Sequence, residues 1–81
     1  MTREEIFKAL DEVFCEVFDD ETIKVGENTT ANDIEDWDSL EHINLVVAIE
    51  KRFSMKFTMG EVTTMKNVGE MVDIIRERVQ Q

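Results

Sequence analysis

The sequence predicts an all-α protein, a small four-helix bundle with a long loop between its first two helices and a short third helix. The 81 residues include no proline and three glycines, and hydrophobic residues recur at helical spacing in four segments. Each segment follows a residue that can cap a helix, with glutamate three positions later. These pairs are Thr2 and Glu5, Asp38 and Glu41, Thr58 and Glu61, and Asn67 and Glu70.

The elements follow one another along the chain. The first helix covers about residues 3–18, and residues 19–37 form a long loop, where helical spacing is lost and asparagine, threonine and glycine accumulate. Ile23, Val25 and Ile34 are expected to pin this loop to the helices. The hydrophobic stripe of the first helix consists of Ile6, Phe7, Leu10, Val13, Phe14 and Val17.

The second helix, about residues 39–53, carries a wide hydrophobic stripe and a narrower one beside it. The third helix is short, about residues 59–64, and the fourth covers about residues 68–79. The wide stripe consists of Leu45, Val46, Ile49 and Phe53, and the narrow stripe of Leu40, Ile43 and Val47. The inward residues of the fourth helix are Val68, Met71, Val72, Ile75 and Val79.

Size and charge restrict the classes of function. Residues 1–81 are enough for one domain with a modest core. The net charge of -10 argues against binding to nucleic acid or to anionic membranes. Cys15 is the only cysteine, which allows no internal disulfide, and no segment is apolar enough to span a membrane or serve as a signal peptide. We therefore expect a cytoplasmic monomer without membrane insertion.

Ser39 is the most informative residue of the chain. It stands at the first position of the second helix, after a segment rich in carboxylates, and is expected to be exposed at the positive end of the helix dipole. A helix start favours an attached phosphate group, whereas the surrounding carboxylates favour a partner with a basic surface. A serine at a helix start can also be a simple capping-region residue. The whole pattern favours an attachment site.

The tripeptide Asp-Ser-Leu at residues 38–40, opening a helix that ends in AIEKRF at residues 48–53, resembles the acyl carrier protein family. The resemblance covers nearly the whole chain and implies the acyl-carrier-like bundle. It implies that 4′-phosphopantetheine, taken from coenzyme A, is attached covalently to the motif serine and carries acyl groups as thioesters. It further implies a non-catalytic role in a fatty-acid, polyketide or specialised lipid pathway.

The resemblance assigns roles to single residues. Ser39 matches the attachment serine, Asp38 the acid that helps to engage the transferase, and Leu40 the residue that packs beside the arm. The implied partners are a phosphopantetheinyl transferase, acyl transferases or ligases, and ketosynthase-type enzymes. No catalytic residue and no metal ligand is implied. The residues implied to face partners are Glu41, Ile43, Val47 and Glu50.

Four positions depart from the family pattern. Trp37 stands where many members have a small or aliphatic residue. Asn44, Lys51 and Arg52 stand where fatty-acid carriers are often acidic. The second helix is therefore less acidic at its far end, which favours a carrier dedicated to a specialised pathway.

Other classes of function remain open at this point. A peptidyl or aminoacyl carrier would share the motif, and a small acidic Ca²⁺-responsive or helical interaction module would carry no prosthetic group. A true EF-hand is disfavoured, because Asp38 stands where the loop would need glycine if Asp33 came first. A hydrolase built on Ser39 and His42 is disfavoured, because the sequence has no nucleophile elbow.

Several further side chains carry expectations. Trp37 is expected to anchor the loop, and His42 to face solvent beside the partner contacts. Cys15 is expected to lie at the edge of the core rather than to react. An acyl chain entering between the helices is expected to affect Ile49 together with two methionines, Met65 and Met71. The methionines expected to fill gaps in the core are Met55, Met59, Met65 and Met71.

Overall fold

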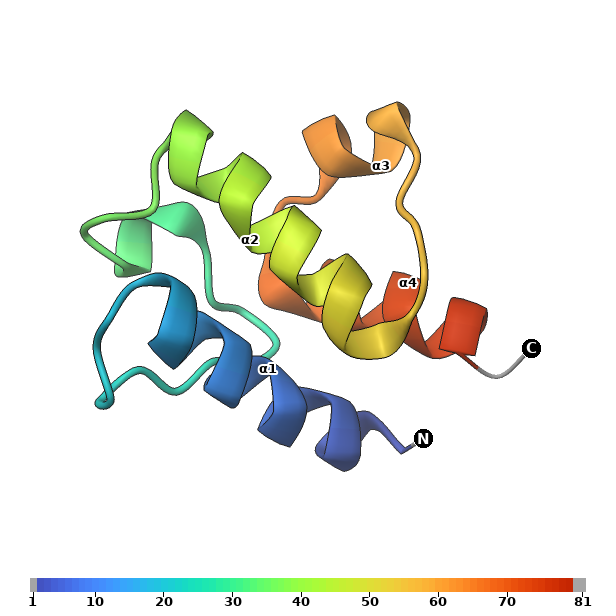
Figure 1. Ribbon diagram of the computed structural model, residues 1–81, viewed down its shortest axis with the longest axis horizontal. Helices are drawn as coiled ribbons and strands as arrows, with labels where there is room; N and C mark the ends of the chain where they lie inside the picture. The colour runs from blue at the N-terminus through green and yellow to red at the C-terminus, as the bar shows by residue number, and fades with distance from the viewer. Residues whose placement is uncertain (1, 80–81) are drawn as a thin grey trace.

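The computed structural model describes residues 2–79, which form four α-helices and a 3₁₀ turn and measure 33 × 25 × 22 Å (Figure 1). Over this part of the chain there is no strand, so the predicted all-α class is confirmed. In Figure 1, α2 crosses the centre of the molecule between α1 and α3. The elements are α1 (Arg3–Val17), η1 (Ala31–Asp33), α2 (Ser39–Phe53), α3 (Met59–Thr64) and α4 (Val68–Val79).

The core lies between α1, α2 and α4, as the hydrophobic spacing predicts. The wide stripe of α2 is buried at all four positions, and so are four of the five inward residues expected on α4. Phe7, Val17 and Val79 are only half-buried, whereas Ala9 joins the core. None of the residues of α3 is buried. The short helix is therefore held by contacts at its edges rather than by a core of its own.

The predicted caps set the helix starts. The Thr2 and Thr58 hydroxyls accept from the N–H groups of residues three positions later, and both pairs close a full capping box. Asp38 accepts the Glu41 N–H at 2.8 Å, which makes Ser39 the first residue of α2. Asn67 likewise accepts the Glu70 N–H at 2.9 Å.

The loop between α1 and α2 is fixed at both of its ends and in its middle. Val25 is buried, and Ile23 and Ile34 pack partly buried against the core, which confirms the expected anchors. In the middle, the Val68 N–H donates to the Thr29 carbonyl at 2.8 Å and the neighbouring Gly69 N–H to the Glu27 carbonyl at 3.0 Å. The N-terminus of α4 therefore holds the loop by backbone contacts.

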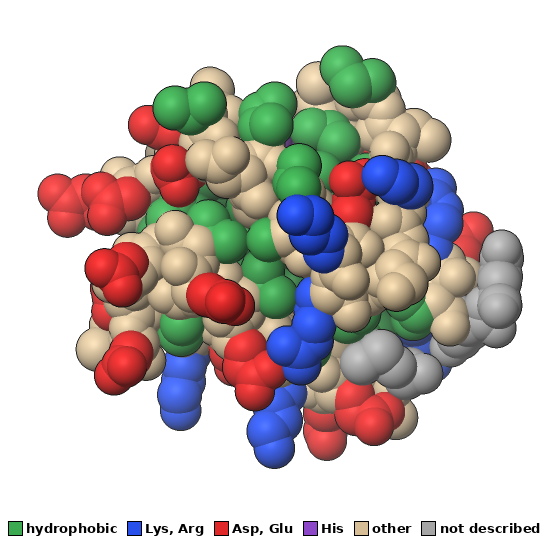
Figure 2. All heavy atoms as spheres, in the orientation of Figure 1, with side chains coloured by type: hydrophobic (Ala, Val, Ile, Leu, Met, Phe, Trp, Pro, Cys, Tyr) green, Lys and Arg blue, Asp and Glu red, His purple; other side chains and the backbone are tan. Residues whose placement is uncertain are grey.

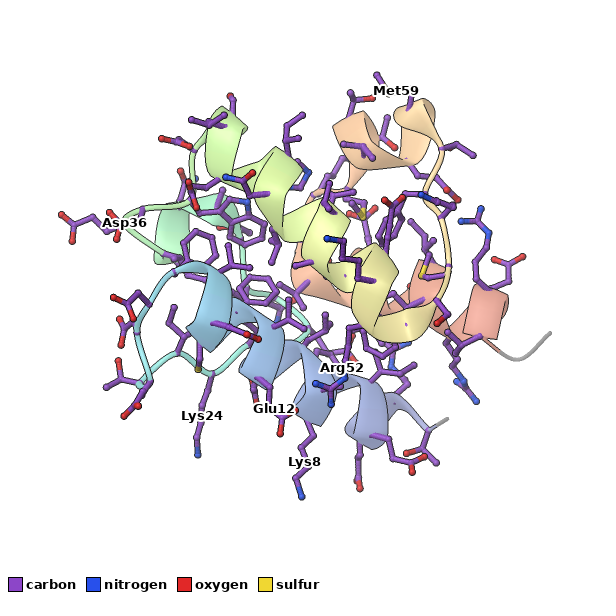
Figure 3. All side chains as sticks on the ribbon, in the orientation of Figure 1. Lys8, Glu12, Lys24, Asp36, Arg52 and Met59 are labelled. Atoms are coloured by element: carbon purple, nitrogen blue, oxygen red, sulfur yellow. The ribbon has the colours of Figure 1, made fainter. Side chains whose placement is uncertain are left out.

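Two local features differ from the sequence prediction. The loop contains the short turn η1, whose Thr30 and Asp33 form another capping box. Met59 was expected in the core, but this is wrong: it is 80% exposed, and Figure 3 shows it pointing outward from α3. It is the first residue of a six-residue helix in which no residue is buried, and its side chain projects into solvent. No helix in residues 2–79 has the length and apolar character needed to cross a bilayer.

Candidate functional site

Ser39 is exposed on the rim of the molecule, at the first position of α2. The carboxylate of Asp38 is turned back onto the helix to cap the Glu41 N–H, so it shapes the helix start beside the serine. The Glu41 carboxylate does not reach back to Asp38 and instead accepts from the Asn44 side chain at 3.3 Å. The Ser39 hydroxyl is thus displayed to solvent on a helix whose first turn is fixed.

An exposed strip of hydrophobic residues runs along α2 away from Ser39. Leu40, Ile43 and Val47, the narrow stripe of the sequence, are 70%, 56% and 44% exposed. Figure 2 shows hydrophobic side chains gathered along the upper edge of the molecule, over α2 and α3, where Met59 also projects in Figure 3. Exposed large apolar side chains in a row mark a surface for partners. This exposed strip therefore suits the partner-facing role predicted for Ile43 and Val47.

The charges around the strip have opposite signs at its two ends. Asp36, Asp38 and Glu41 lie at the end near Ser39, and the side chain of Asp36 points away from the loop in Figure 3. At the other end α2 finishes with Lys51 and Arg52, both exposed. The Arg52 guanidinium pairs with Glu12 of α1 at 2.8 Å, which leaves Lys51 as the cation nearest the strip on this last turn.

Glu50 has an internal partner that the sequence did not reveal. Its carboxylate accepts the backbone N–H of Phe57 at 2.9 Å, and the side chain is half-buried. It therefore ties the segment between α2 and α3 to the last turn of α2. The bond joins residues seven positions apart across an irregular connection, so neither helical spacing nor a cap motif could have indicated it.

A cavity of about 440 Å³ opens beside Ser39, between α2, α3 and the start of α4. Its walls are mostly apolar, and α3 with the residues after it forms one whole side. Of the residues expected to respond to an acyl chain, Met65 and Met71 line this cavity, whereas Ile49 lies fully buried in the core. The lining includes Ser39, His42, Ile43, Val62, Met65 and Met71.

The position expected for His42 is wrong: the side chain is half-buried rather than facing solvent. Its Nδ1 accepts from the Trp37 indole N–H at 3.1 Å, and its Nε2 lies 3.0 Å from the Val62 carbonyl oxygen. The two rings stack with their centroids 5.9 Å apart. Trp37 also meets Phe14 edge to face at 5.3 Å, which confirms it as the anchor of the loop. The Trp37 indole and the Val62 carbonyl of α3 thus hold His42 inward.

On the side away from His42, α3 is held by an ion pair with α4. Arg78 donates to Glu61 at 2.6 Å and to the Lys56 carbonyl at 2.8 Å. The Arg78 guanidinium, followed by the Thr58 N–H, lowers the pKa of Glu61 below its ordinary value. Within residues 2–79 no group of three or more His, Cys, Asp or Glu side chains is arranged to hold a metal ion.

The residues around Ser39 fit a covalently attached phosphopantetheine group. The serine hydroxyl is free of the core, its helix start is fixed by Asp38, and an apolar cavity opens at its side. A phosphodiester on Ser39 would remain in water, where its charge is solvated, while an apolar cargo could enter the cavity.

Comparisons with known proteins agree with this geometry. The chain matches the family model described as the phosphopantetheine attachment site over residues 8–75. It is 36% identical over 75 residues to an acyl carrier protein of Acidothermus cellulolyticus, covering 93% of this chain and 89% of the relative. It is also similar to the solution NMR structure of a holo acyl carrier protein from Geobacter metallireducens, with a TM-score of 0.86 and 42% identity. That match covers 91% of this chain and 85% of the other.

Proposed function

The chain belongs to the acyl carrier protein family, whose cofactor is 4′-phosphopantetheine, and we propose that Ser39 is the residue that carries it. The observation that supports this most directly is the exposed hydroxyl at the first position of α2, beside the cavity. Attachment forms a bond between Ser39 Oγ and the phosphate of coenzyme A that bears pantetheine. The pyrophosphate bond breaks, 3′,5′-ADP leaves, and the serine proton passes to a base of the transferase or to water.

The attached group supplies a thiol that holds acyl groups as thioesters. The chain itself contributes position. Asp38 fixes the first turn of α2, so the point of attachment is constant, and Leu40 offers an apolar contact at the base of the arm. Tethering raises the effective concentration of the cargo at a partner's active site. We propose that the chain has no catalytic residue and that all bond-making steps are performed by its partners.

Partner enzymes bind the exposed strip and the charges that flank it in this proposal. A basic surface on the partner meets Glu41 near Ser39, and its apolar residues meet Ile43 and Val47. Glu50 contributes at the edge of this surface while it holds Phe57. The phosphopantetheinyl transferase, acyl transferases or ligases, and ketosynthase-type enzymes all use this face, in the cytoplasm and with the chain as a monomer. Such contacts are weak and salt-sensitive, which allows the carrier to leave after each step.

The cations at the end of α2 support a dedicated pathway rather than general fatty-acid synthesis. Lys51 is exposed next to the strip, and Asn44 is exposed along α2. A partner with a uniformly basic docking surface would be repelled at Lys51, and like charges brought together across an interface discriminate between partners.

Intact mass tests the attachment. The chain is incubated with coenzyme A, Mg²⁺ and a broad-specificity phosphopantetheinyl transferase, and the wild type is expected to gain the mass of one phosphopantetheine. Ser39→Ala is expected to gain nothing. Ser54→Gly is the matched control, because Ser54 is the chain's other serine, it is exposed at the far end of α2, and its positive φ of 52° suits glycine. Absence of a gain in folded wild type that began without the group, or a gain that survives in Ser39→Ala, would overturn the proposal.

Loading by a fatty-acid malonyl transferase tests the pathway. The holo chain is expected to be malonylated more slowly than a housekeeping carrier, and the double variant Asn44→Glu with Lys51→Glu is expected to be malonylated faster than wild type. A wild type loaded as fast as the housekeeping carrier would exclude the dedicated pathway and leave the attachment at Ser39 unaffected.

A further inference from the structure

His42 connects three separate segments of the chain. It lies on α2, it accepts from Trp37 in the loop before the helix, and it contacts the Val62 carbonyl of α3. The Val62 carbonyl can only accept a hydrogen bond, so Nε2 carries the ring proton and donates at 3.0 Å. Nδ1 is then the unprotonated nitrogen, which agrees with its acceptance of the indole N–H at 3.1 Å. Both ring nitrogens are therefore satisfied in one neutral tautomer.

Few other contacts hold α3 in place. None of its residues is buried, and six residues are too short for a helix that is stable alone. Its first turn is held on one side by the ion pair between Glu61 and Arg78 at 2.6 Å. On the side that faces α2, the hydrogen bond from His42 to the Val62 carbonyl joins α3 to α2. The position of α3 is thus sensitive to a single imidazole.

The same contact lies in the wall of the cavity. His42 and Val62 both line it, as do Trp37 and Met65, so the separation of α2 and α3 determines its width. We propose that His42 is a positioning residue that fixes α3 against α2 and thereby determines the length of acyl chain that the cavity accepts. This inference depends on the proposed function, because the cargo reaches the cavity from Ser39.

The expected effect depends on chain length. A short acyl group fits in the cavity with the His42 bond intact, whereas a chain too long for the cavity must push α3 outward and break that bond. Each methylene that enters an apolar cavity favours the buried state by about fourfold, and the lost hydrogen bond opposes burial by about fivefold. In the wild type, the broken hydrogen bond therefore cancels part of the stabilisation that a longer chain obtains by burying its methylenes. In His42→Leu, which places an apolar side chain of similar size there without the bond, burial of a long chain breaks no such hydrogen bond.

Hydrogen exchange on the chain without its prosthetic group tests the positioning directly. In His42→Leu the amides of Val62 and Met65, which bond within α3 at 3.0 and 3.2 Å, are expected to exchange about fivefold faster. Amides of α1 and α4 are expected to keep the wild-type rates. His42→Gln, whose amide can still donate to the Val62 carbonyl, is expected to restore slow exchange. Arg52→Gln is the control, because it breaks a surface pair between α2 and α1 remote from α3. Equal α3 rates in wild type and His42→Leu would overturn the proposal, as would acceleration spread evenly over all helices.

Thioester protection tests the consequence for cargo. Acetyl, hexanoyl and dodecanoyl forms of the holo chain are treated with hydroxylamine, and the rate of thioester loss is measured for wild type and His42→Leu. The variant is expected to protect dodecanoyl more strongly relative to acetyl than the wild type does. An unchanged ratio would refute the role in cargo length while the attachment at Ser39 stands. A chain that cannot be loaded at all would instead refute the proposed function, so the two failures are distinct. The imidazole ¹⁵N shifts of the wild type provide a further check, since they are expected to show a proton on Nε2 alone.

Discussion

Replacement of Gly69 by alanine tests how the loop that leads to Ser39 is held. A Cβ at this position would lie 2.6 Å from the Glu27 carbonyl oxygen and 2.8 Å from its carboxylate Oε1. Contacts this short do not occur, so the loop backbone must move away. That movement stretches the bond from the Gly69 N–H to Glu27 at 3.0 Å and disturbs the neighbouring bond from Val68 to Thr29 at 2.8 Å. The loop would therefore lose its fixed point on α4.

The size of the effect follows from opposing contributions. Forced overpacking costs about 1–3 kcal/mol, and a weakened backbone hydrogen bond about 1 kcal/mol. Alanine recovers up to about 1 kcal/mol of helix propensity. With the full recovery of helix propensity, we expect a net loss of about 1–3 kcal/mol in the free energy of unfolding. Each kcal/mol lost corresponds to a fall of roughly 4–8 °C in the melting temperature of a domain of this size.

Urea unfolding with a matched glycine measures this effect. In Gly60→Ala the nearest atom to the new Cβ is the Thr58 hydroxyl oxygen at 4.0 Å, an ordinary van der Waals contact, so the substitution forces nothing to move. We expect that variant to be as stable as the wild type or up to about 1 kcal/mol more stable. Comparable m-values would show that the same surface is exposed on unfolding. A Gly69→Ala protein as stable as Gly60→Ala would refute the reasoning.

Two further predictions concern charge. Because Arg78 and the Thr58 N–H lower the pKa of Glu61, the ionised carboxylate stabilises the fold above about pH 4.5, and this contribution is lost as the pH falls further. The decrease in the free energy of unfolding caused by Glu61→Gln, measured with urea, is therefore expected to be largest at neutral pH and to become smaller in acid. A decrease that does not change with pH would contradict this prediction. Because the net charge is -10, raising the ionic strength from about 0.01 to 0.15 M at neutral pH should raise the melting temperature; a decrease would contradict the self-repulsion argument.

The helices could be predicted from the sequence because two independent patterns agree. Hydrophobic spacing indicates which face is buried, and the cap pairs indicate where each helix begins. At Asp38 the cap alone places Ser39 at the first helical position, as the bond to the Glu41 N–H at 2.8 Å confirms. A related signal, Thr30 followed three positions later by Asp33 rather than glutamate, marks the turn η1. It was missed because no hydrophobic run follows it.

The inward position of His42 could not be predicted in this way. Its burial depends on Val62, which lies twenty positions away on a helix with no buried residue, and on the indole N–H of Trp37. The expectation for Met59 was wrong for the related reason that a six-residue helix has room for few inward positions. Hydrophobic spacing predicts the buried face of a single helix. Whether His42 and Met59 are buried depends instead on how neighbouring helices lie relative to one another.

The fold separates the requirements of the proposed attachment at Ser39 from those of the proposed cargo in the cavity. Attachment requires a constant position for Ser39, and its helix has its wide stripe buried against α1 and α4 in the core. Cargo requires a wall that can move, and α3 has no buried residue and is held mainly by polar contacts through His42 and Arg78. Polar contacts of this kind can be broken and remade at a small cost compared with a packed core. A cavity bordered by α3 can therefore adapt to its contents while the attachment point on α2 stays fixed.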